Sequence, residues 1–400
     1  MAGPTSIEWT DRTWNPVRGC TRVSPGCGGP GPHGGCYAER VAARFSTPGL
    51  PYEGLAETRG GKPRWTGRIS FGHDLDAPLR WRKPARIFVN SMSDLFHEGL
   101  TDAQIDRVFA VMALCPQHTF QVLTKRSARM RAYFEARRDG DPWAEAADEI
   151  ADLIGLKDHP HVLEPEHLPL PNLWLGVSAE DQQRADERVP DLLATPAAVR
   201  FVSAEPLLGP IDFMALPLPG VGVCRGPKKA LLGMTISQVR EILAASQDGR
   251  ACDYIPSFDA LNGHNAFRDY FGLSALDWII VGGESGPGAR PMHPDWARSI
   301  RDQCAKAGVP FFFKQWGEWI DADQIADRMA GSADVYIARN GHRWDPPRPL
   351  NFDDAAILAG VIGHRLEHQS DGRTNFRAGK RAAGRLLDGR THDAMPEVRP

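Results

Sequence analysis

The sequence predicts an α/β protein: a parallel, partial β/α barrel of about six or seven strands, with a helical insertion and a C-terminal extension. From about residue 85 to 320, short β-rich runs alternate with helical stretches, which is the pattern of βαβ units. The strand cores are almost continuously apolar, as expected of parallel strands buried on both faces. Polar residues follow the end of each run, where barrel enzymes place their active sites. A doubly wound open sheet is the alternative arrangement.

The strands and helices can be placed in chain order. A first strand is expected near residues 6–10, before a cysteine-containing loop at 14–45. A helix should begin at Thr101 or Asp102, because either side chain can cap a first turn. Other helices are expected from residue 36 and after residues 127, 181 and 292. The remaining strand cores are FVN, FQVL, LWLGV, RFVS, WIIVG and PFFF, within residues 85–96, 118–127, 172–181, 199–210, 277–288 and 309–319.

The predicted barrel domain spans residues 1–330, and two segments interrupt its pattern. Residues 137–170 indicate an acidic helix followed by a loop rich in proline and histidine. Residues from about 215 to 275 form the insertion, with one clear helix, TISQVREILAASQ, and a helix-like run, NAFRDYF. The predicted C-terminal helical extension covers residues 331–400 and includes a basic helix over 375–390.

Composition narrows the class of protein. The 47 Lys and Arg residues nearly balance the 50 Asp and Glu residues, so the chain as a whole gives no argument for a polyanionic partner, although a local basic groove remains open. No apolar run approaches the ~20 residues that span a bilayer, and the N-terminus lacks the apolar core of a signal peptide. We therefore expect a cytoplasmic protein with no membrane partner. Seven cysteines, an odd number, argue against a disulfide framework, and Cys115 and Cys304 should be buried in helices.

The strongest chemical signal is a group of three cysteines, Cys20, Cys27 and Cys36, in a loop rich in glycine and proline. Thiolates are soft ligands that suit iron–sulfur clusters, zinc or copper(I). Three thiolates leave one iron of a [4Fe–4S] cluster open, and that iron can bind S-adenosyl-L-methionine and deliver an electron to its sulfonium. Structural zinc with His33 as a fourth ligand is the alternative. Three free thiols are the remaining interpretation.

Polar residues at the predicted strand ends are the candidates for the rest of the site. If S-adenosyl-L-methionine binds, its carboxylate needs a cation, and Lys125, Arg126 or Lys314 can supply one. Glu205 and Glu284, with Lys314, are candidates for holding the substrate or shuttling protons. The same residue types could instead form salt bridges at the barrel mouth, such as Lys125–Glu180. The candidates for contacts to the ribose, the adenine or the cluster are Asn90, Ser91, Asp94, Ser178, Glu180 and Tyr37.

The order of these motifs resembles a known family. The motifs are IEWTDRTWNPVRGC, CYAE, FVNSMSDLF, LTKR, LWLGVSAED, RFVSAEPLLGPI, DWIIVGGESGPGARPMHPDW, FFFKQWGEW and GKRAAGRLLDGR, and they cover most of the chain. They resemble a bacteriophage and prophage family of three-cysteine-motif proteins of undefined function, which is distantly similar to radical S-adenosylmethionine enzymes such as spore photoproduct lyase. In that family C-x2-C is the usual second gap, whereas eight residues separate Cys27 from Cys36 here.

A second departure concerns a Gly-Gly-Glu that radical S-adenosylmethionine enzymes carry at the end of their second strand. The second strand here ends in NSMSD, and Gly282-Gly283-Glu284 follows the sixth strand instead. The cofactor role of that motif is therefore not transferred. The GGESGPG segment is equally suited to a nest of backbone N–H groups around an anion, or to a tight turn between strand and helix.

Together, the resemblance and the three cysteines imply an iron–sulfur enzyme of the radical S-adenosylmethionine type. It would generate a 5′-deoxyadenosyl radical that acts on a nucleotide or a nucleic-acid base. Such chemistry implies a reductant protein as partner, and the resemblance implies a further partner protein encoded nearby. Two alternatives stay open: a zinc-stabilised, non-catalytic phage protein that binds nucleic acid, and a non-redox barrel enzyme with a structural metal.

Overall fold

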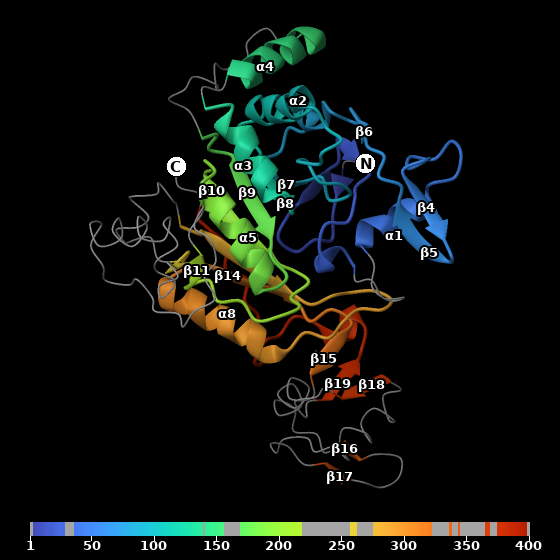
Figure 1. Cartoon of the computed structure of the whole chain (residues 1–400), viewed down its shortest axis with the longest axis vertical. Helices are drawn as coiled ribbons and strands as arrows, with labels where there is room; N and C mark the ends of the chain where they lie inside the picture. The colour runs from blue at the N-terminus through green and yellow to red at the C-terminus, as the bar shows by residue number, and fades with distance from the viewer. Residues whose placement is uncertain are drawn as a thin grey trace, which may run out of the picture.

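The computed structural model describes residues 3–28, 36–138, 141–155, 169–217, 257–261, 275–321, 336–337, 343–344, 365–368 and 374–397. Its centre is a sheet curled into a half-barrel (Figure 1), in the order β1-β2-β7-β8-β9-β10-β13-β14. Apart from β1 (Gly3–Pro4), which is antiparallel to its neighbour, all of these strands are parallel. The parallel strands are β2 (Arg12–Trp14), β7 (Arg86–Val89), β8 (Thr119–Thr124), β9 (Leu173–Ser178), β10 (Val199–Ala204), β13 (Trp278–Gly282) and β14 (Phe311–Gln315).

The strand order confirms the predicted partial barrel. Neighbours in the sheet follow one another along the chain without reversal, whereas a doubly wound sheet reverses its order at a switch point. The first strand was expected at residues 6–10, and that placement is wrong. The chain turns there, with the backbone N–H of Thr10 bonded to the carbonyl of Ile7, and the parallel strand starts at Arg12. The side chain of Trp9, which lies in this turn, packs against Phe88 inside the half-barrel.

Strands β9, β10, β13 and β14 are buried on both faces over almost all of their length, as their apolar runs predict, whereas β2 and β7 keep half-buried residues. On β9, Leu175 and Val177 pack in the large core beneath the helices, whereas Trp174 lies among the aromatic rings inside the half-barrel. Phe201 and Trp278 continue the inner cluster on the next two strands, with ring centroids 5.8 Å apart. The interior is therefore a packed core; Gln121 is buried within β8, and the polar candidates for the site gather at the ends of the strands.

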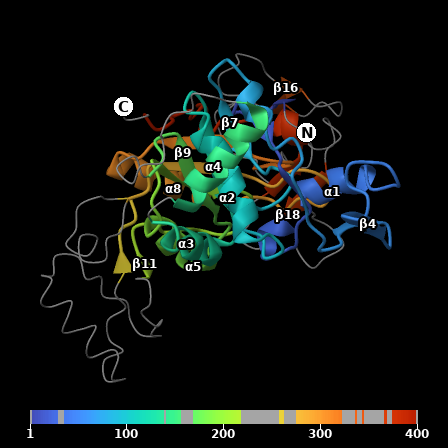
Figure 2. The same cartoon turned by 90° about the horizontal axis from the view of Figure 1, so that it is seen from above.

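The predicted helices join the strands. They are α2 (Asp102–Ala113), α3 (Ser127–Glu135), α5 (Gln182–Leu193) and α8 (Pro294–Ala307). Thr101 caps α2 through a capping box with Gln104, which confirms the predicted start. The acidic helix α4 (Asp141–Ile154) packs outside α2 (Figures 1 and 2), where Trp143 stacks on Phe109 with ring centroids 5.0 Å apart. Cys115 and Cys304 are fully buried, as predicted.

Smaller elements surround the half-barrel. On the N-terminal side these are η1 (Pro25–Cys27), α1 (Tyr37–Arg44), the hairpin β4 (Ala56–Arg59) and β5 (Lys62–Trp65), η2 (Ala77–Arg80), and β3 (Val17–Arg18) paired with β6 (Ser70–Phe71). The predicted insertion, about residues 215–275, contains a short antiparallel pair, β11 (Leu216–Pro217) and β12 (Ser257–Phe258). Its two predicted helices lie outside the described residues.

The C-terminal part differs from the expected helical extension. Its described elements are the antiparallel strands β15 (Trp319–Asp321), β18 (Arg365–His368) and β19 (Thr374–Arg377), the pair β16 (Tyr336–Ile337) and β17 (Arg343–Trp344), and one short helix, α11 (Lys380–Ala383). The basic helix predicted over 375–390 is wrong, because Gly379 and Gly384 both take positive φ values and confine α11 between them. None of the helices in the described ranges is long and apolar enough to span a membrane.

Candidate functional site

The cysteine loop lies against the carboxyl edge of the half-barrel. Gly19 forms a parallel bridge with Ser93, which follows β7, so Cys20 comes directly after this contact. Gly19 has a φ of +94°, and a Cβ atom at this position would lie 2.2 Å from the carbonyl oxygen of Arg68. Only glycine meets both conditions, because any larger residue would combine a steric clash with left-handed backbone strain.

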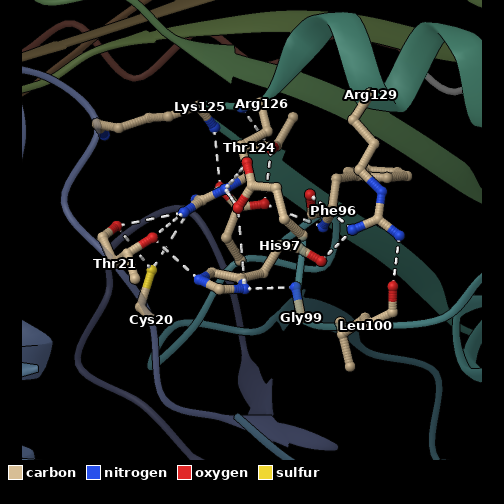
Figure 3. A network of polar contacts seen from close by, with 12 residues as sticks. Cys20, Thr21, Phe96, His97, Gly99, Leu100, Thr124, Lys125, Arg126 and Arg129 are labelled. Atoms are coloured by element: carbon tan, nitrogen blue, oxygen red, sulfur yellow. Dashed lines mark hydrogen bonds and ion pairs between the residues drawn. The ribbon is translucent and has the colours of Figure 1, made fainter. Parts of the chain in front are cut away.

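Arg126, which follows β8, joins this edge to the cysteine loop (Figure 3). Its Nη1 donates to Oδ2 of Asp94 at 3.0 Å, and its Nε lies 3.0 Å from both carboxylate oxygens of Glu98. Its Nη2 donates to Oγ1 of Thr21 at 2.7 Å, and Nη1 lies 4.0 Å from Sγ of Cys20. Burial opposes the charge on Arg126, but Asp94, Cys20 and Glu98 outweigh it and raise its pKa. The guanidinium therefore stays charged beside the first cysteine.

Asp94 was a candidate for a cofactor contact, but its carboxylate accepts hydrogen bonds from other residues of the protein. Its Oδ1 accepts a hydrogen bond from Oγ1 of Thr124 at 2.7 Å, and its Oδ2 accepts from the backbone N–H of Lys125 at 3.1 Å. With Arg126 as a further donor, this carboxylate ties the ends of β7 and β8 together. The ammonium group of Lys125, by contrast, makes no hydrogen bond or ion pair with any of the described residues. Lys125 is thus the available cation of this group.

Glu180, which follows β9, holds the middle of the cysteine loop. It is fully buried, and its Oε1 accepts a hydrogen bond from the backbone N–H of Gly26 at 3.0 Å. Its Oε2 accepts from Nη1 of Arg188 at 3.1 Å, and the same Nη1 donates to the carbonyl of Ser178 at 2.7 Å. Burial opposes ionisation of Glu180, but the charges of Lys125 and Arg188 outweigh it and lower its pKa. The close ion pair of Glu180 is therefore with Arg188, and Lys125 acts on it from farther away.

Glu284, which follows β13, reaches the loop through Arg290. The two side chains form a bidentate pair, with 2.7 Å from Nε to Oε2 and 2.9 Å from Nη2 to Oε1. Nη2 of Arg290 also donates to the carbonyl oxygen of Pro25 at 2.9 Å. Three strand ends, those of β8, β9 and β13, therefore fasten residues 21–26 over the edge of the half-barrel.

Two of the three loop cysteines, Cys20 and Cys36, have raised pKa values. Burial, followed by the charge of Asp94, raises the pKa of Cys20 to about 12, and Cys36 and Cys27 add to this rise. Burial also raises the pKa of Cys36, and Cys27 contributes to that shift. Within the described residues, no three His, Cys, Asp or Glu side chains are arranged closely enough to bind a metal ion. Residues 29–35, between Cys27 and Cys36, lie outside the description, and so does the alternative zinc ligand His33.

Asn90 and Ser91 lie on the same edge after β7. Asn90 is buried in a left-handed conformation, and its Oδ1 accepts from the backbone N–H of Val17 at 3.3 Å. Its Nδ2 has no acceptor among the described residues, so a buried donor is left for a ligand or a water molecule. The hydroxyl of Ser91 donates to Oδ1 of Asn15 at 3.1 Å and is used within the protein.

Glu205 and Lys314, two predicted catalytic residues, form an ion pair at the far end of the edge. Nζ of Lys314 lies 3.0 and 2.9 Å from the two carboxylate oxygens of Glu205, and Nε2 of Gln315 donates to Oε1 at 3.1 Å. Consecutive residues point to the same carboxylate because the register between β13 and β14 shifts at Val281/Gly282. The third predicted catalytic residue, Glu284, is paired with Arg290 instead.

The aromatic candidates separate into one exposed ring and two buried ones. Tyr37, beside Cys36, is 64% exposed, so its ring does not pack against the half-barrel. Trp316 and Trp319 are buried, with their indole N–H groups bonded to the carbonyls of Leu386 and Ala289. Both tryptophans are therefore structural and do not present a ring for stacking on a base.

The GGESGPG segment forms a tight turn closed by a carboxylate of the same chain. The backbone N–H of Gly286 donates to Oε1 of Glu318 at 2.8 Å, and the N–H of Gly283 donates to the carbonyl of Gln315. A Cβ at Gly283 would lie 1.9 Å from the carbonyl oxygen of Trp316, so two backbones meet here. The anion held by the backbone N–H of Gly286 is Glu318, and the turn needs no ligand.

Sequence reasoning missed three residues that position the loop: Arg188, Arg290 and Glu39. Nε of Arg22, in the loop, donates to Oε1 of Glu39 at 3.0 Å, and Glu39 is nearly fully buried on α1. A signal was present for Arg188, which stands on a helix eight residues after a strand-end carboxylate. The sequence carries no comparable signal for Arg290, because this residue lies in an irregular loop and binds a backbone carbonyl.

Comparison with known proteins identifies one relationship. A family model described as a protein of unknown function matches residues 4–396, which is nearly the whole chain. No curated protein and no solved structure matches the chain.

Proposed function

Because the chain belongs to the DUF5131 family of proteins of unknown function, we propose a function from its own site: an iron–sulfur enzyme of the radical S-adenosylmethionine type. Its substrate would be a nucleotide or a nucleic-acid base. The feature that supports the proposal is the presence of Cys20, Cys27 and Cys36 in one short segment that Arg126, Glu180 and Arg290 fasten to the carboxyl edge of a parallel half-barrel.

The three cysteine thiols are suitable ligands for an iron–sulfur cluster. Three thiols from one short segment give soft ligands and leave one coordination position open. The raised pKa values of Cys20 and Cys36 mean that these thiols are protonated without a metal, so binding must release protons. Arg126 lies beside Cys20 and offsets part of the negative charge that the thiolates would carry. Among the described residues, the three cysteines do not form a closed metal site.

A bound [4Fe–4S] cluster, reduced by an external one-electron donor, would pass that electron to the sulfonium of S-adenosyl-L-methionine, so that the S–C5′ bond would break into methionine and a 5′-deoxyadenosyl radical. The protein's own residues do the positioning. Arg126, Glu180 and Arg290 hold residues 21–26 in place, and each does so with a polar group fixed on a different strand end. Preorganisation of this kind supports a site that must keep a reactive species away from water.

The remaining polar groups support binding of a substrate with carboxylate, phosphate or base functions. Lys125 offers an ammonium group without a protein partner in the described ranges, and Asn90 offers a buried amide donor. Lys314 and Glu205 offer a proton donor and acceptor 2.9 Å apart. The resemblance to phage and prophage proteins favours nucleic acid or its precursors as the substrate.

Anaerobic purification tests the proposal. The expected protein is brown, absorbs at about 400 nm and holds about four irons per chain, and each of Cys20→Ala, Cys27→Ala and Cys36→Ala removes that iron. Cys115→Ala is the matched control, because this cysteine is buried in the core away from the loop and should leave the iron content unchanged. A colourless protein with one tightly bound zinc would contradict the proposal and favour the non-catalytic alternative.

A second measurement tests the chemistry. Reduction of the iron-loaded protein with dithionite should release 5′-deoxyadenosine from S-adenosyl-L-methionine. An intact cluster that releases none, with nucleotides and oligonucleotides supplied as substrates, would leave a structural or electron-transfer cluster and refute the radical mechanism.

A further inference from the structure

The side chain of Thr21, the residue after Cys20, is fixed by contacts on three sides. Its Oγ1 accepts a hydrogen bond from Nη2 of Arg126 at 2.7 Å and lies 3.0 Å from Nε2 of His97. A Cβ atom at Gly67 would lie 3.6 Å from the Thr21 methyl group, so this methyl packs close to the backbone there. Dashed lines in Figure 3 join the guanidinium of Arg126 to Thr21 and to Sγ of Cys20. The hydroxyl of Thr21 and the sulfur of Cys20 therefore lie at the same end of one guanidinium.

A second hydrogen bond of His97 determines which ring nitrogen carries the proton. The backbone N–H of Gly99 donates to Nδ1 of His97 at 2.9 Å, so Nδ1 presents a lone pair. A neutral imidazole then carries its proton on Nε2, and this N–H donates to Oγ1 of Thr21. A Cβ atom at Gly99 would lie 3.2 Å from Nδ1, so the small size of glycine permits this close approach.

The imidazole of His97 is neutral in this network. It is buried, and burial lowers its pKa, with the positive charge of Arg126 as the next contribution. Glu98 and Asp94 act in the opposite direction without reversing the shift. The carboxylate of Glu98 lies 3.9 Å from Nδ1, beyond hydrogen-bond distance, and bonds to Nε of Arg126 at 3.0 Å instead. His97 therefore acts on Thr21 as a neutral donor.

These two donors leave the hydroxyl of Thr21 with a single role. A hydroxyl oxygen has two lone pairs, and the N–H groups of Arg126 and His97 take both of them. The hydroxyl proton must then point away from both donors, and it has no acceptor within the part of the chain that the structure describes. Thr21 is thus an oriented donor without a partner, on the residue next to Cys20.

We propose that His97 is a positioning residue, which acts with Arg126 to direct the hydroxyl proton of Thr21 to the sulfurs of a cluster bound at Cys20. Hydrogen bonds to its sulfurs help to set the reduction potential of an iron–sulfur cluster. Groups that orient or hydrogen-bond the ligands of a metal also raise its affinity. The inference rests on the proposed function for the identity of the acceptor. The orientation of Thr21 by His97 does not depend on any metal.

The tautomer of His97 can be measured without a metal. Long-range proton–nitrogen NMR spectra of the metal-free, full-length protein with isotope-labelled histidine distinguish the two tautomers from the charged ring. The signals of His97 are assigned by their loss in His97→Gln. At neutral pH we expect the Nε2–H tautomer, because Nδ1 accepts from Gly99. An Nδ1–H tautomer or a charged ring would overturn the proposal.

Two variants of Thr21 test the donor. Thr21→Val removes the hydroxyl and nearly keeps the shape, and it should lose iron to a chelator roughly tenfold faster than the parent protein or more. The midpoint potential of the remaining cluster should become more negative, because the lost hydrogen bond favours the reduced, more negative state. Thr21→Ser keeps the hydroxyl and should match the parent. Thr195→Val is the control, since this hydroxyl donates to the carbonyl of Asp191, on the helix α5 and outside the loop.

Two variants of His97 separate its two nitrogens. His97→Gln can place an amide N–H near the position of Nε2 and should keep parent-like iron retention. His97→Asn keeps an acceptor for Gly99 but is too short to reach Thr21, so it should behave as Thr21→Val does. Equal iron retention in His97→Gln and His97→Asn would overturn the proposal.

The outcomes separate this inference from the proposed function. In a parent protein that binds no iron, the Nε2–H tautomer would still support the positioning of Thr21, and only the proposed function would be contradicted. In an iron-loaded parent, a Thr21→Val variant with unchanged iron retention and unchanged potential would contradict this inference alone.

Discussion

The backbone N–H of Gly26 donates a hydrogen bond to Oε1 of Glu180 at 3.0 Å, and this contact joins the cysteine loop to a strand 154 residues away in the sequence. Glu180 is fully buried and also binds Arg188, so its carboxylate stays ionised. Because the acceptor is fixed and charged, it positions the loop more strongly than a neutral group could. The loop beside Cys27 therefore depends on a charge held inside the protein.

Replacing Glu180 should make the free energy of unfolding depend less on pH in the acidic range. Glu180→Gln keeps an oxygen for Gly26 but leaves Arg188 without its charged partner, which should cost about 3–5 kcal/mol at neutral pH. The folded-state pKa of Glu180 lies below the ordinary 4.5, so its contribution is complete above that value and is lost as pH falls through the lower folded value. Urea unfolding across a pH series should show the parent and the variant converging in acid. A constant gap over the whole series would contradict this role.

Removing the Arg126 guanidinium should loosen the first cysteine. Arg126→Ala leaves Asp94 as a buried carboxylate without its main cation, and we expect a loss of about 3–5 kcal/mol with fewer irons per chain. Thermal unfolding and iron analysis measure the two effects. Arg131→Ala is the control, since Arg131 makes a half-exposed pair with Glu135 that should contribute within about 0.5 kcal/mol. Equal behaviour of the two variants would refute the proposed role of Arg126.

Alanine variants of Gly19 and Gly61 distinguish the cost of a steric clash from the cost of left-handed backbone strain. Gly19 and Gly61 both have positive φ, but only at Gly19 would a Cβ meet backbone, 2.2 Å from the carbonyl of Arg68. Gly61→Ala should cost about 1 kcal/mol from strain alone. Gly19→Ala should cost clearly more and also lower the iron content, because the residue precedes Cys20. Similar iron content and melting temperature in the two variants would show that the loop tolerates the displacement.

The ion pair at the far end of the edge should matter for turnover and not for cluster binding. Lys314→Met removes the cation from Glu205 without touching residues 20–27, so iron content should match that of the parent. Turnover should fall by roughly a hundredfold or more if Lys314 moves a proton. Lys306→Met, at an exposed position on α8, is the control for the loss of one lysine. A parent-like rate in Lys314→Met would remove the pair from the mechanism.

His118 should make the fold sensitive to mild acid. Burial lowers its pKa from the ordinary 6.5, against the opposing effect of the hydrogen bond between its Nε2 and the carbonyl of Trp81 at 3.0 Å. Below pH 6.5 the unfolded chain takes up the proton before the folded protein does, so stability falls with pH until the lower folded value is reached. His118→Gln should flatten the stability profile between about pH 5 and 7. An unchanged slope would place the pH dependence on other groups.

The sequence by itself predicted most of the elements and the edge of the sheet at which the candidate site residues gather. Apolar runs such as LWLGV predicted strands buried on both faces, and the Thr101 cap predicted a helix start, because both features are local. Placing Glu180, Glu205 and Lys314 at one edge followed from parallel strands sharing a direction. The expected strand at 6–10 and the helix at 375–390 failed where a turn and two glycines override local propensity.

Only the tertiary structure decided which of these groups meet. Glu205 pairs with Lys314 across 109 residues, and Arg290 reaches the Pro25 carbonyl across 265, because strand order and one register shift bring them together. It also left Tyr37, a candidate for the site, exposed and buried Trp316. Partner choice and burial depend on contacts between distant segments. Periodicity along the chain carries no information about them, so the sequence placed the candidate residues at one edge, whereas the fold decided which of them pair.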